Sequence, residues 1–376
     1  MKRVLHISTY FPPHIGGVEQ VVSDIVDSLK GKYEQMVLAF NHEKSDSEET
    51  IDGVTIFRCK PNFKVSSQAI ALGYGKKLKS IIKNFNPDII HFHFPNPYAA
   101  HFLLQCKTNA KIIVHYHSDI IKQKILKKFF VGQTKRLLNR ADKIVATSPQ
   151  YIDHSEFLYK YKDKCVLVPN CINENRLAMT SEDIEESRRL KEKYRDKIVC
   201  LFIGRHVPYK GLIYLIKAAQ YIDDNIVIRI AGNGPLTDEL KKQADGSDNV
   251  EFIGKVDQLN SNFDSCDIFT FPSITKNEAF GIALAEAMWF SKPAVTYYIE
   301  GSGVNYVGIK DETCIECENR NVQQLADAIN KLASDADLRK TLGQNALKRV
   351  EELFTFAHFK ENVNNLYEQV INENCD

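Results

Sequence analysis

The stretch VLHISTYFPPHIGGVEQVVSDIVDSL, residues 4–29, contains the pattern that decides the fold. A short apolar run, Val4 to Ser8, is followed by two prolines and two glycines, and apolar residues then recur at positions 18, 21, 22, 25, 26 and 29. The run predicts a buried strand, the prolines and glycines predict a loop, and the three-to-four-residue spacing predicts an amphipathic helix. The stretch therefore predicts a strand, a loop and a helix in that order.

The same alternation repeats along the first half of the chain. Between the apolar runs lie segments with helical periodicity. Continuous apolar strands separated by helices indicate a parallel sheet that is covered on both faces. The runs that predict these further strands are residues 35–40, 54–59, 88–94, 111–116, 142–147 and 165–168.

A second set of strands follows a charged stretch at residues 181–196, which has acids first and bases later, as an exposed helix would. The apolar runs of this second set are residues 198–204, 226–231, 250–253, 267–271 and 293–297, and from residue 322 onward the pattern is helical. We therefore predict two Rossmann-like, doubly wound parallel-sheet α/β domains. Their expected bounds are 1–172 and 173–354, and residues 355–376 are expected to form a C-terminal helix that crosses back to the first domain.

The composition fits a folded protein with two hydrophobic cores. The 376 residues exceed what one core commonly supports, and 44% of them are apolar and 26% charged. A formal net charge of +1 gives no electrostatic signature of nucleic-acid binding. No apolar run approaches the roughly 20 residues of a membrane span, and the run after Arg3 is too short and too polar for a signal peptide. We therefore expect a cytoplasmic protein that binds no nucleic acid.

The nine cysteines are an odd number, scattered along a chain without an export signal, so we expect reduced, buried thiols. Cys314 and Cys317 have the CxxC spacing. No second pair or nearby histidines complete a zinc site, and Ile315 and Glu316 do not indicate a redox motif that opens a helix. We expect these two cysteines to be structural.

Ligands of open parallel sheets bind outside the carboxyl ends of the strands, so the loops there are candidate sites. In the first domain, Gly16 and Gly17 stand at the start of a predicted helix, where bare N–H groups and the helix dipole favour an anion. A tight turn without a ligand is the alternative for this pair.

In the second domain, the strand that ends near Ile203 runs into a loop that carries Arg205 and Lys210. Two cations at the end of a strand suit a diphosphate. The next strand is followed by Gly232 and Gly234, which would bring a second backbone close to the same ligand. Turn chemistry alone explains either loop, but the two loops at equivalent strand ends favour a binding site.

Glu278 and Glu286 are eight residues apart in a segment that we predict to be helical from near Ala279. That spacing corresponds to about 12 Å along a helix, enough for one carboxylate to meet a hexose and the other a ribose. Gly281 between them would leave the backbone at the helix N-terminus open to phosphates.

In this order, the motifs resemble the retaining GT-B glycosyltransferases of family 4, and the resemblance spans nearly the whole chain. It implies a GT-B fold, whose two domains face each other across a cleft, and metal-independent transfer from a nucleotide-diphosphate sugar with retention at the anomeric carbon. The donor would bind mainly to the C-terminal domain and the acceptor to the N-terminal one. Neither a cofactor nor a metal is expected. The motifs are Gly16-Gly17, His117, the segment 204–211, the segment 232–235 and the segment 278–286.

The resemblance also implies roles for single residues. Arg205 and Lys210 would bind the diphosphate and stabilise its charge as it leaves. Glu278 would contact the donor sugar, and Glu286 the ribose. The backbone of Phe280, Gly281 and Ile282 would contact phosphate and sugar oxygens, beside Gly16, Gly17, Gly232 and Gly234. His117 would lie beside the donor sugar, although this chain has His115 where the family has Thr and Ser118 where it has Gly.

The pairs His91 with His93 and His115 with His117 allow a second interpretation, since alternate residues of a strand point the same way and could bind a metal. The absence of companion carboxylates favours the alternative that His91 and His93 end a strand at the rim of the cleft.

Residues 120–141 contain seven Lys or Arg residues, no acid and interleaved apolar residues. This basic amphipathic stretch could dock on an anionic membrane surface, which would suit a lipid-linked acceptor. A solvated helix with an ordinary core face is the alternative.

We interpret the chain as a hexosyltransferase of surface polysaccharide assembly, such as lipopolysaccharide or capsule, cytoplasmic or peripheral on the inner face of the membrane. The stretch 277–281 and the stretch 301–305 look most like mannosyl- or rhamnosyltransferases, which favours GDP-mannose over UDP- or dTDP-sugars. A UDP-sugar used on a small-molecule acceptor is the first alternative. An NAD-dependent dehydrogenase is disfavoured because no GxGxxG follows the first strand. A non-catalytic carbohydrate-binding protein is disfavoured by the intact charged motif residues.

Overall fold

The computed structural model describes residues 1–13, 16–65, 68–119, 124–256 and 259–372. The chain divides into two compact units. The first consists of Met1–Pro169 together with Ala357–Asp376, and the second of Asn170–Phe356. We expected the boundaries after residues 172 and 354. The chain therefore leaves the first unit once and returns to it at its C-terminal end.

The first unit contains an eight-stranded sheet in the order β10-β9-β8-β7-β1-β2-β4-β3 and a separate β5-β6 hairpin. Its strands are β1 (Lys2–Ile7), β2 (Tyr33–Phe40), β3 (Ser47–Ile51), β4 (Val54–Cys59), β5 (Phe63–Val65), β6 (Gln68–Ile70), β7 (Ile89–Phe94), β8 (Lys111–Tyr116), β9 (Lys143–Ala146) and β10 (Cys165–Leu167). All neighbours in the large sheet pair in parallel except β3 with β4. Strand β1 lies inside the sheet. The chain first adds β2, β3 and β4 on one side of β1 and then adds β7 to β10 on the other.

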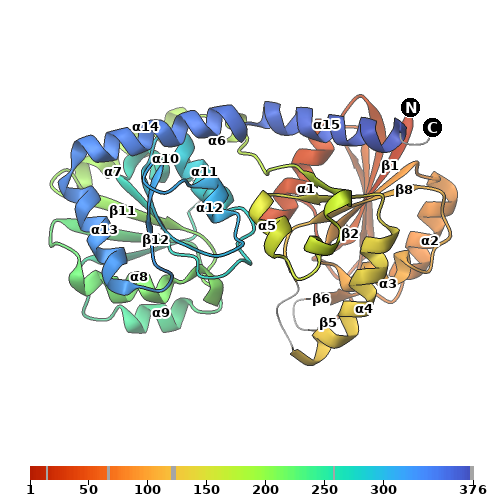
Figure 1. The fold of residues 1–376 in the computed structure, drawn as a ribbon, viewed down its shortest axis with the longest axis horizontal. Coiled ribbons are helices and arrows are strands. Elements are labelled where there is room, and N and C mark those ends of the chain that lie inside the picture. Colours follow the sequence, from red (N-terminus) through yellow and green to blue (C-terminus); the bar gives the residue numbers. More distant parts are fainter. Residues whose placement is uncertain (14–15, 66–67, 120–123, 257–258, 373–376) are drawn as a thin grey trace. The chain divides into compact units, whose positions relative to one another are not determined.

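Helices cover both faces of this sheet, with α1 on one face and α2 and α3 on the other (Figure 1). The helices are α1 (Gly17–Ser28), α2 (Tyr74–Phe85), α3 (Pro97–Leu103), α4 (Lys124–Arg140), α5 (Pro149–His154) and α15 (Phe356–Asn372), with short 3-10 turns at Leu158–Lys160 and Lys162–Lys164. Helix α1 buries Val21, Val22, Ile25 and Val26, as its spacing predicts. Helix α15 packs beside α1, where the Asn364 side chain donates to the Ser28 carbonyl oxygen at 3.4 Å.

The second unit contains a six-stranded parallel sheet in the order β13-β12-β11-β14-β15-β16. Its strands are β11 (Ile198–Ile203), β12 (Ile226–Ala231), β13 (Val250–Gly254), β14 (Ile268–Phe271), β15 (Ala294–Tyr297) and β16 (Cys314–Cys317). Strand β11 comes first in the chain and lies in the middle, so the connection from β13 to β14 crosses the sheet. The two central strands, β11 and β14, are buried almost throughout because helices cover both faces.

In this unit, α8, α9 and α13 lie on one face of the sheet and α7, α10, α11 and α14 on the other (Figure 1). The helices are α6 (Glu174–Leu177), α7 (Ser181–Lys193), α8 (Leu212–Ala218), α9 (Thr237–Gln243), α10 (Leu259–Ser265), α11 (Ile282–Trp289), α12 (Val304–Val307), α13 (Val322–Ser334) and α14 (Ala336–Leu353), with 3-10 turns at Pro208–Lys210 and Ala219–Tyr221. A capping box between Thr180 and Asp183 begins α7, the helix that the charge pattern predicts.

The structure confirms the predicted fold class and every strand that the apolar runs predict. It adds β3, β5, β6 and β16, which the sequence pattern did not predict. Cys314 and Cys317 lie on β16 as buried free thiols, and burial raises the pKa of each to about 12. Among the described residues, no helix has the length and apolar content needed to cross a membrane.

Candidate active site

The candidate site lies at the switch point of the second sheet, between β11 and β14. The chain builds outward from β11 to β13 on one side and from β14 to β16 on the other, so the loops after β11 and β14 lead to opposite sides of the sheet. Such a point opens a crevice at the carboxyl ends of the strands. The loop after β11 carries Arg205 and Lys210, and the loop after β14 carries Glu278.

Lys210 is buried. It ends the 3-10 turn Pro208–Lys210. Its ammonium group lies 4.6 Å from the centre of the Phe271 ring and 5.6 Å from that of Tyr209, so the aromatic faces contribute to holding the charge. The side chain therefore projects back over the end of β14 and not into solvent.

Glu278 is the partner of Lys210. The Lys210 Nζ and Glu278 Oε2 atoms are 2.5 Å apart, and the two side chains are only 11% and 12% exposed. Ser273 donates its hydroxyl to the same Oε2 atom at 3.2 Å, and Ser302 donates to the Glu278 carbonyl oxygen at 2.5 Å. Removing one partner of a buried ion pair typically costs about 3–5 kcal/mol, because the other charge stays buried alone. The pair therefore joins the loops after β11 and β14.

The prediction that Glu278 and Glu286 share one helix is wrong. Helix α11 begins at Ile282, and its N-cap residue Gly281 has a φ of 98°, a left-handed conformation that a residue with a side chain rarely adopts. The backbone therefore changes direction at Gly281, between the two glutamates. Glu278 lies in the loop, and the 12 Å separation along one helix does not apply.

The N-terminus of α11 is open. The first amide of the helix with a backbone acceptor is that of Leu284, which donates to the Gly281 carbonyl oxygen at 3.0 Å. In the described chain, the N–H groups of Gly281, Ile282 and Ala283 have no backbone acceptor. Unpaired N–H groups and the positive end of the helix dipole attract an anion. The backbone predicted to contact phosphate oxygens is thus available.

The remaining residues of this motif differ in exposure. The Phe280 side chain is buried and packs edge-to-face against Phe354 at 5.3 Å between ring centres, so it belongs to the core. Ile282 and Glu286 are half-buried. Glu286 lies on α11, one turn beyond the open N-terminus.

Gly232 and Gly234 are required by the approach of two loops. A Cβ atom on Gly232 would lie 2.0 Å from the Gly204 carbonyl oxygen, and Gly232 has a φ of 112°. A Cβ atom on Gly234 would lie 2.4 Å from the His206 carbonyl oxygen. The loop after β12 therefore packs backbone against backbone on the loop that carries Arg205. This packing accounts for both glycines without a ligand, and their contact with a donor stays a prediction.

Arg205 is exposed, in contrast to Lys210. Its guanidinium group has no hydrogen-bond or ion-pair partner among the residues that the structure describes. It lies close enough to Tyr209 to oppose the rise in the Tyr209 pKa that burial causes. The loop after β11 therefore presents one free cation beside one paired cation.

His117 lies in the first unit, directly after β8. It is buried, and burial lowers its pKa to about 3, so the imidazole is neutral at pH 7. Its Nε2 atom is 3.1 Å from His93 Nδ1. His91 and His93 are 1% exposed, so the expectation that they stand at a rim is wrong. They lie inside the unit because β7 is a central strand.

Gly16 and Gly17 also lie in the first unit, at the start of α1. Gly16 is the N-cap residue with an extended backbone. Glu19 folds back over it, so that a Cβ atom on Gly16 would lie 2.2 Å from the Glu19 carboxylate. Burial raises the pKa of Glu19, and a hydrogen bond from its own backbone N–H opposes that rise. A carboxylate of the chain thus occupies the position expected for an anion, which favours the alternative of a turn without a ligand.

Sequence reasoning missed the residues that support Glu278. Ser273 and Phe271 contact the ion pair, and Ser302 bonds to the backbone of Glu278. No spacing rule points to these residues. Position offers a weak signal for Ser273 alone, since it stands two residues after the end of β14. Contacts between loops of different strands depend on strand order, which the sequence pattern leaves open.

Two family models match the chain. "Glycosyltransferase Family 4" matches residues 15–176, and "Glycosyl transferases group 1" matches residues 183–349. The chain is 32% identical to the O-antigen chain mannosyltransferase C of Escherichia coli, covering 97% of this chain and 98% of that protein. It is 31% identical to the D-rhamnosyltransferase WbpZ of Pseudomonas aeruginosa, covering 94% and 92%.

Solved structures show the same fold at low identity. Sucrose-phosphate synthase from Thermosynechococcus elongatus superposes with a TM-score of 0.81 and 19% identity over 99% of both chains. HepE from Anabaena, solved with UDP-glucose, superposes with a TM-score of 0.78 and 16% identity over 98% of this chain and 100% of that one. The two doubly wound units and the similarity to these relatives support the same family assignment. The chain is a glycosyltransferase of family 4 with the GT-B fold.

Proposed function

We propose that the enzyme transfers a hexose, with mannose or rhamnose as the first choices, from a nucleotide-diphosphate sugar to a surface glycan or its lipid-linked precursor. The relatives named for mannosyl and rhamnosyl transfer support the sugar, and the O-antigen function of one of them supports the acceptor class. GDP-mannose is the donor to test first. A UDP-sugar is the second candidate, because a structural neighbour is solved with UDP-glucose.

The observation that carries this proposal is the buried Lys210–Glu278 pair beside the exposed Arg205 and the open N-terminus of α11. A diphosphate needs several positive groups and bare N–H donors, and these meet at the switch point of one sheet. Glu278 supplies carboxylate oxygens that suit the vicinal hydroxyls of a sugar. The same small region thus offers a position for each half of a nucleotide-sugar.

In the proposed reaction, the anomeric carbon exchanges its bond to the diphosphate oxygen for a bond to an acceptor hydroxyl oxygen, with retention. The proton of that hydroxyl leaves with the diphosphate or passes to solvent. Negative charge develops on the leaving diphosphate. Lys210, Arg205 and the N–H groups of α11 stabilise that charge, the task that a divalent cation performs in other transferases. The transfer accordingly proceeds without a metal in the donor site.

The first experiment measures sugar transfer by the full-length protein from GDP-mannose, UDP-glucose and dTDP-rhamnose in the presence of EDTA. Lys210→Ala is expected to lower kcat/KM about 100- to 1,000-fold, the typical effect of removing one group that stabilises developing charge. The anomeric configuration of the product, followed by proton NMR, tests retention.

Lys217→Ala is the matched control, because Lys217 is an exposed lysine on the neighbouring helix α8. It should keep wild-type kcat/KM within about twofold, as exposed substitutions change little. Equal activities of Lys210→Ala and wild type would contradict the proposal that this site binds the diphosphate. Activity that disappears in EDTA and returns with Mg²⁺ would contradict metal independence.

We also propose that residues 120–141 dock on an anionic membrane surface. Residues 120–123 lie outside the described chain. Further along α4, Leu137 and Leu138 are buried while Lys135 and Arg136 are exposed, which leaves basic groups on the outer side. The protein should sediment with vesicles that contain anionic lipid at low salt and remain in solution with neutral vesicles. Retention that is equal on both vesicle types would contradict electrostatic docking.

A further inference from the structure

Five histidines form a buried cluster on one face of the first sheet. His6 lies on β1, His91 and His93 on β7, and His115 and His117 on β8 and just after it; we call these five the histidine cluster. The strand register places His6 beside His91 and His93 beside His115. None of the five is more than 7% exposed. Of the five, His117 alone is expected from the sequence to take part in sugar transfer, so most of the cluster has no assigned role.

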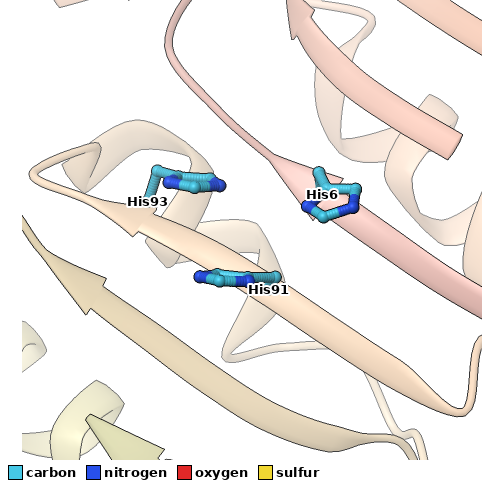
Figure 2. Close-up of side chains that lie close together, drawn as sticks. All are labelled: His6, His91 and His93. Carbon is cyan, nitrogen blue, oxygen red and sulfur yellow. The ribbon is translucent and has the colours of Figure 1, made fainter. Parts of the chain in front are cut away.

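Three members lie together on the two central strands (Figure 2). The rings of His91 and His93 stack with their centres 4.7 Å apart, and the His6 ring is 5.7 Å from His91 and 6.3 Å from His93. One ring nitrogen from each of the three lies within 4.8 Å of the other two. Two alternate residues of one strand and one residue of its neighbour thus bring three imidazoles to one place.

Each of these three rings has one nitrogen engaged and one unpaired. His6 Nε2 is 3.0 Å from Gln35 Oε1, His91 Nδ1 is 2.7 Å from the Tyr367 hydroxyl, and His93 Nδ1 is 3.1 Å from His117 Nε2. The opposite nitrogens, His6 Nδ1, His91 Nε2 and His93 Nε2, are buried without a partner among the described residues. Buried polar atoms are normally hydrogen-bonded, so three unpaired ones in one place indicate a missing ligand.

The hydrogen bonds also set which nitrogen of His6 carries the proton. The Gln35 amide nitrogen donates to the Val26 carbonyl oxygen at 3.0 Å, which turns Gln35 Oε1 toward His6. An amide oxygen only accepts, so His6 Nε2 must donate, and its Nδ1 holds a lone pair. An outer partner that fixes the tautomer in this way is typical of metal-binding histidines.

We propose that His6, His91 and His93 bind a divalent transition-metal ion of the Zn²⁺ class. Three neutral imidazoles with an open fourth position are a known zinc arrangement, and imidazole nitrogen favours Zn²⁺, Co²⁺, Ni²⁺ and Cu²⁺ over Mg²⁺ or Ca²⁺. Binding requires the rings to move together, since tetrahedral zinc ligands are about 3.3 Å apart. The ion would tie β1 to β7 inside the first unit, whereas the residues proposed to bind the diphosphate belong to the second.

A second combination, His93 with His115 and His117, also satisfies the distance criterion. There, however, His93 Nδ1 and His117 Nε2 already face each other as hydrogen-bond partners. His115 has two unpaired nitrogens, but an ion bound through His93 Nδ1 or His117 Nε2 would break the bond between those atoms. In the other combination, His6, His91 and His93 each have an unpaired nitrogen to offer. We therefore assign the site to His6, His91 and His93.

The test uses the full-length protein, stripped with a chelator and titrated with Co²⁺ at pH 7.5. We expect one Co²⁺ per chain with the visible absorption of nitrogen ligation, displaced by Zn²⁺ and unaffected by Mg²⁺. His6→Asn and His91→Asn should each weaken binding at least tenfold. His101→Asn, which changes an exposed histidine on α3, should bind as the wild type does.

Absence of stoichiometric Co²⁺ binding, or equal binding by wild type and His6→Asn, would overturn the proposal. A loss caused by His115→Asn but not by His6→Asn would move the site to the second combination and overturn this assignment. If the variants fail to fold, NMR of the imidazole nitrogens in the wild type gives the answer. Zn²⁺ should shift His6 Nδ1, His91 Nε2 and His93 Nε2, and unchanged signals would reject the site.

Discussion

Each residue of the histidine cluster makes the folded chain less stable in acid, because burial keeps its imidazole neutral in the folded state. In the unfolded chain each titrates near pH 6.5, whereas burial lowers the folded pKa of His117 to about 3 and that of His6 to about 4. Below pH 6.5 the unfolded chain therefore binds more protons than the folded chain. Stability is complete above that pH and falls as the pH decreases toward the folded pKa values.

We expect the free energy of unfolding of the metal-free protein to fall between pH 6.5 and 4.5. Each histidine of the cluster contributes up to about 1.4 kcal/mol per pH unit. Urea unfolding at several pH values measures the slope. His115→Asn should lower it by about one proton, whereas the exposed His101→Asn should leave it unchanged. A stability that does not depend on pH in this range would mean that the cluster is hydrated or protonated when folded.

Single residues also show where sequence reasoning stops. Motif and position predict Arg205, Lys210 and Glu278 as site residues, and they also predict a helix that begins near Ala279. The conformation of Gly281 contradicts that, and it arises where the backbone must turn between β14 and α11. The sequence shows that His91 and His93 alternate on one strand. It does not show that they lie close to His6, because that depends on β1 lying beside β7.

At the level of elements, continuous apolar runs predict the central strands well, because parallel strands with both faces covered must be apolar throughout. Strand β3 was missed because its sequence, SEETI, is polar and lies at the edge of the sheet. A signal was present in Asp52 and Gly53, which both have positive φ angles and join β3 to β4. An Asp-Gly pair between two strands is a strong hairpin indicator.

The close contact between the loops after β11 and β12 predicts that Gly232 tolerates no side chain. Gly232→Ala should destabilise the second unit by about 3 kcal/mol or more, because the new Cβ atom meets the Gly204 carbonyl oxygen in addition to the strained φ. Gly246→Ala is the matched control, since Gly246 has a φ of 82° with nothing within 4 Å of the added atom. It should cost only about 1–2 kcal/mol. Thermal unfolding distinguishes the two variants, and equal losses would show that the backbone conformation alone accounts for Gly232.

At the level of the whole molecule, helix α15 belongs to the first unit although the second unit separates it in the chain. Its buried face includes Phe359, Val363, Leu366, Tyr367 and Val370. Tyr367 packs against Tyr33 at 5.4 Å between ring centres, and its hydroxyl meets His91. The helix thus completes the core of the first unit and reaches the histidine cluster.

Tyr367→Phe should lower the free energy of unfolding by about 1–3 kcal/mol, because it keeps the ring but leaves His91 Nδ1 buried without a partner. Tyr221→Phe, at an exposed position in the second unit, should change stability by less than about 0.5 kcal/mol. Chemical denaturation measures both. A neutral Tyr367→Phe would imply that His91 finds another partner.

The late position of α15 has a consequence for synthesis on the ribosome. Residues Met1–Pro169 emerge first, but the helix that covers one face of their sheet follows only after the whole of Asn170–Phe356. At about 5–20 residues per second, this delay is on the order of 10 s or longer. During that time the apolar surface under α15 is exposed, and the sequence of the second unit is complete before that of the first. The second unit can therefore finish folding before the first, and the nascent first unit is the part that most needs a chaperone.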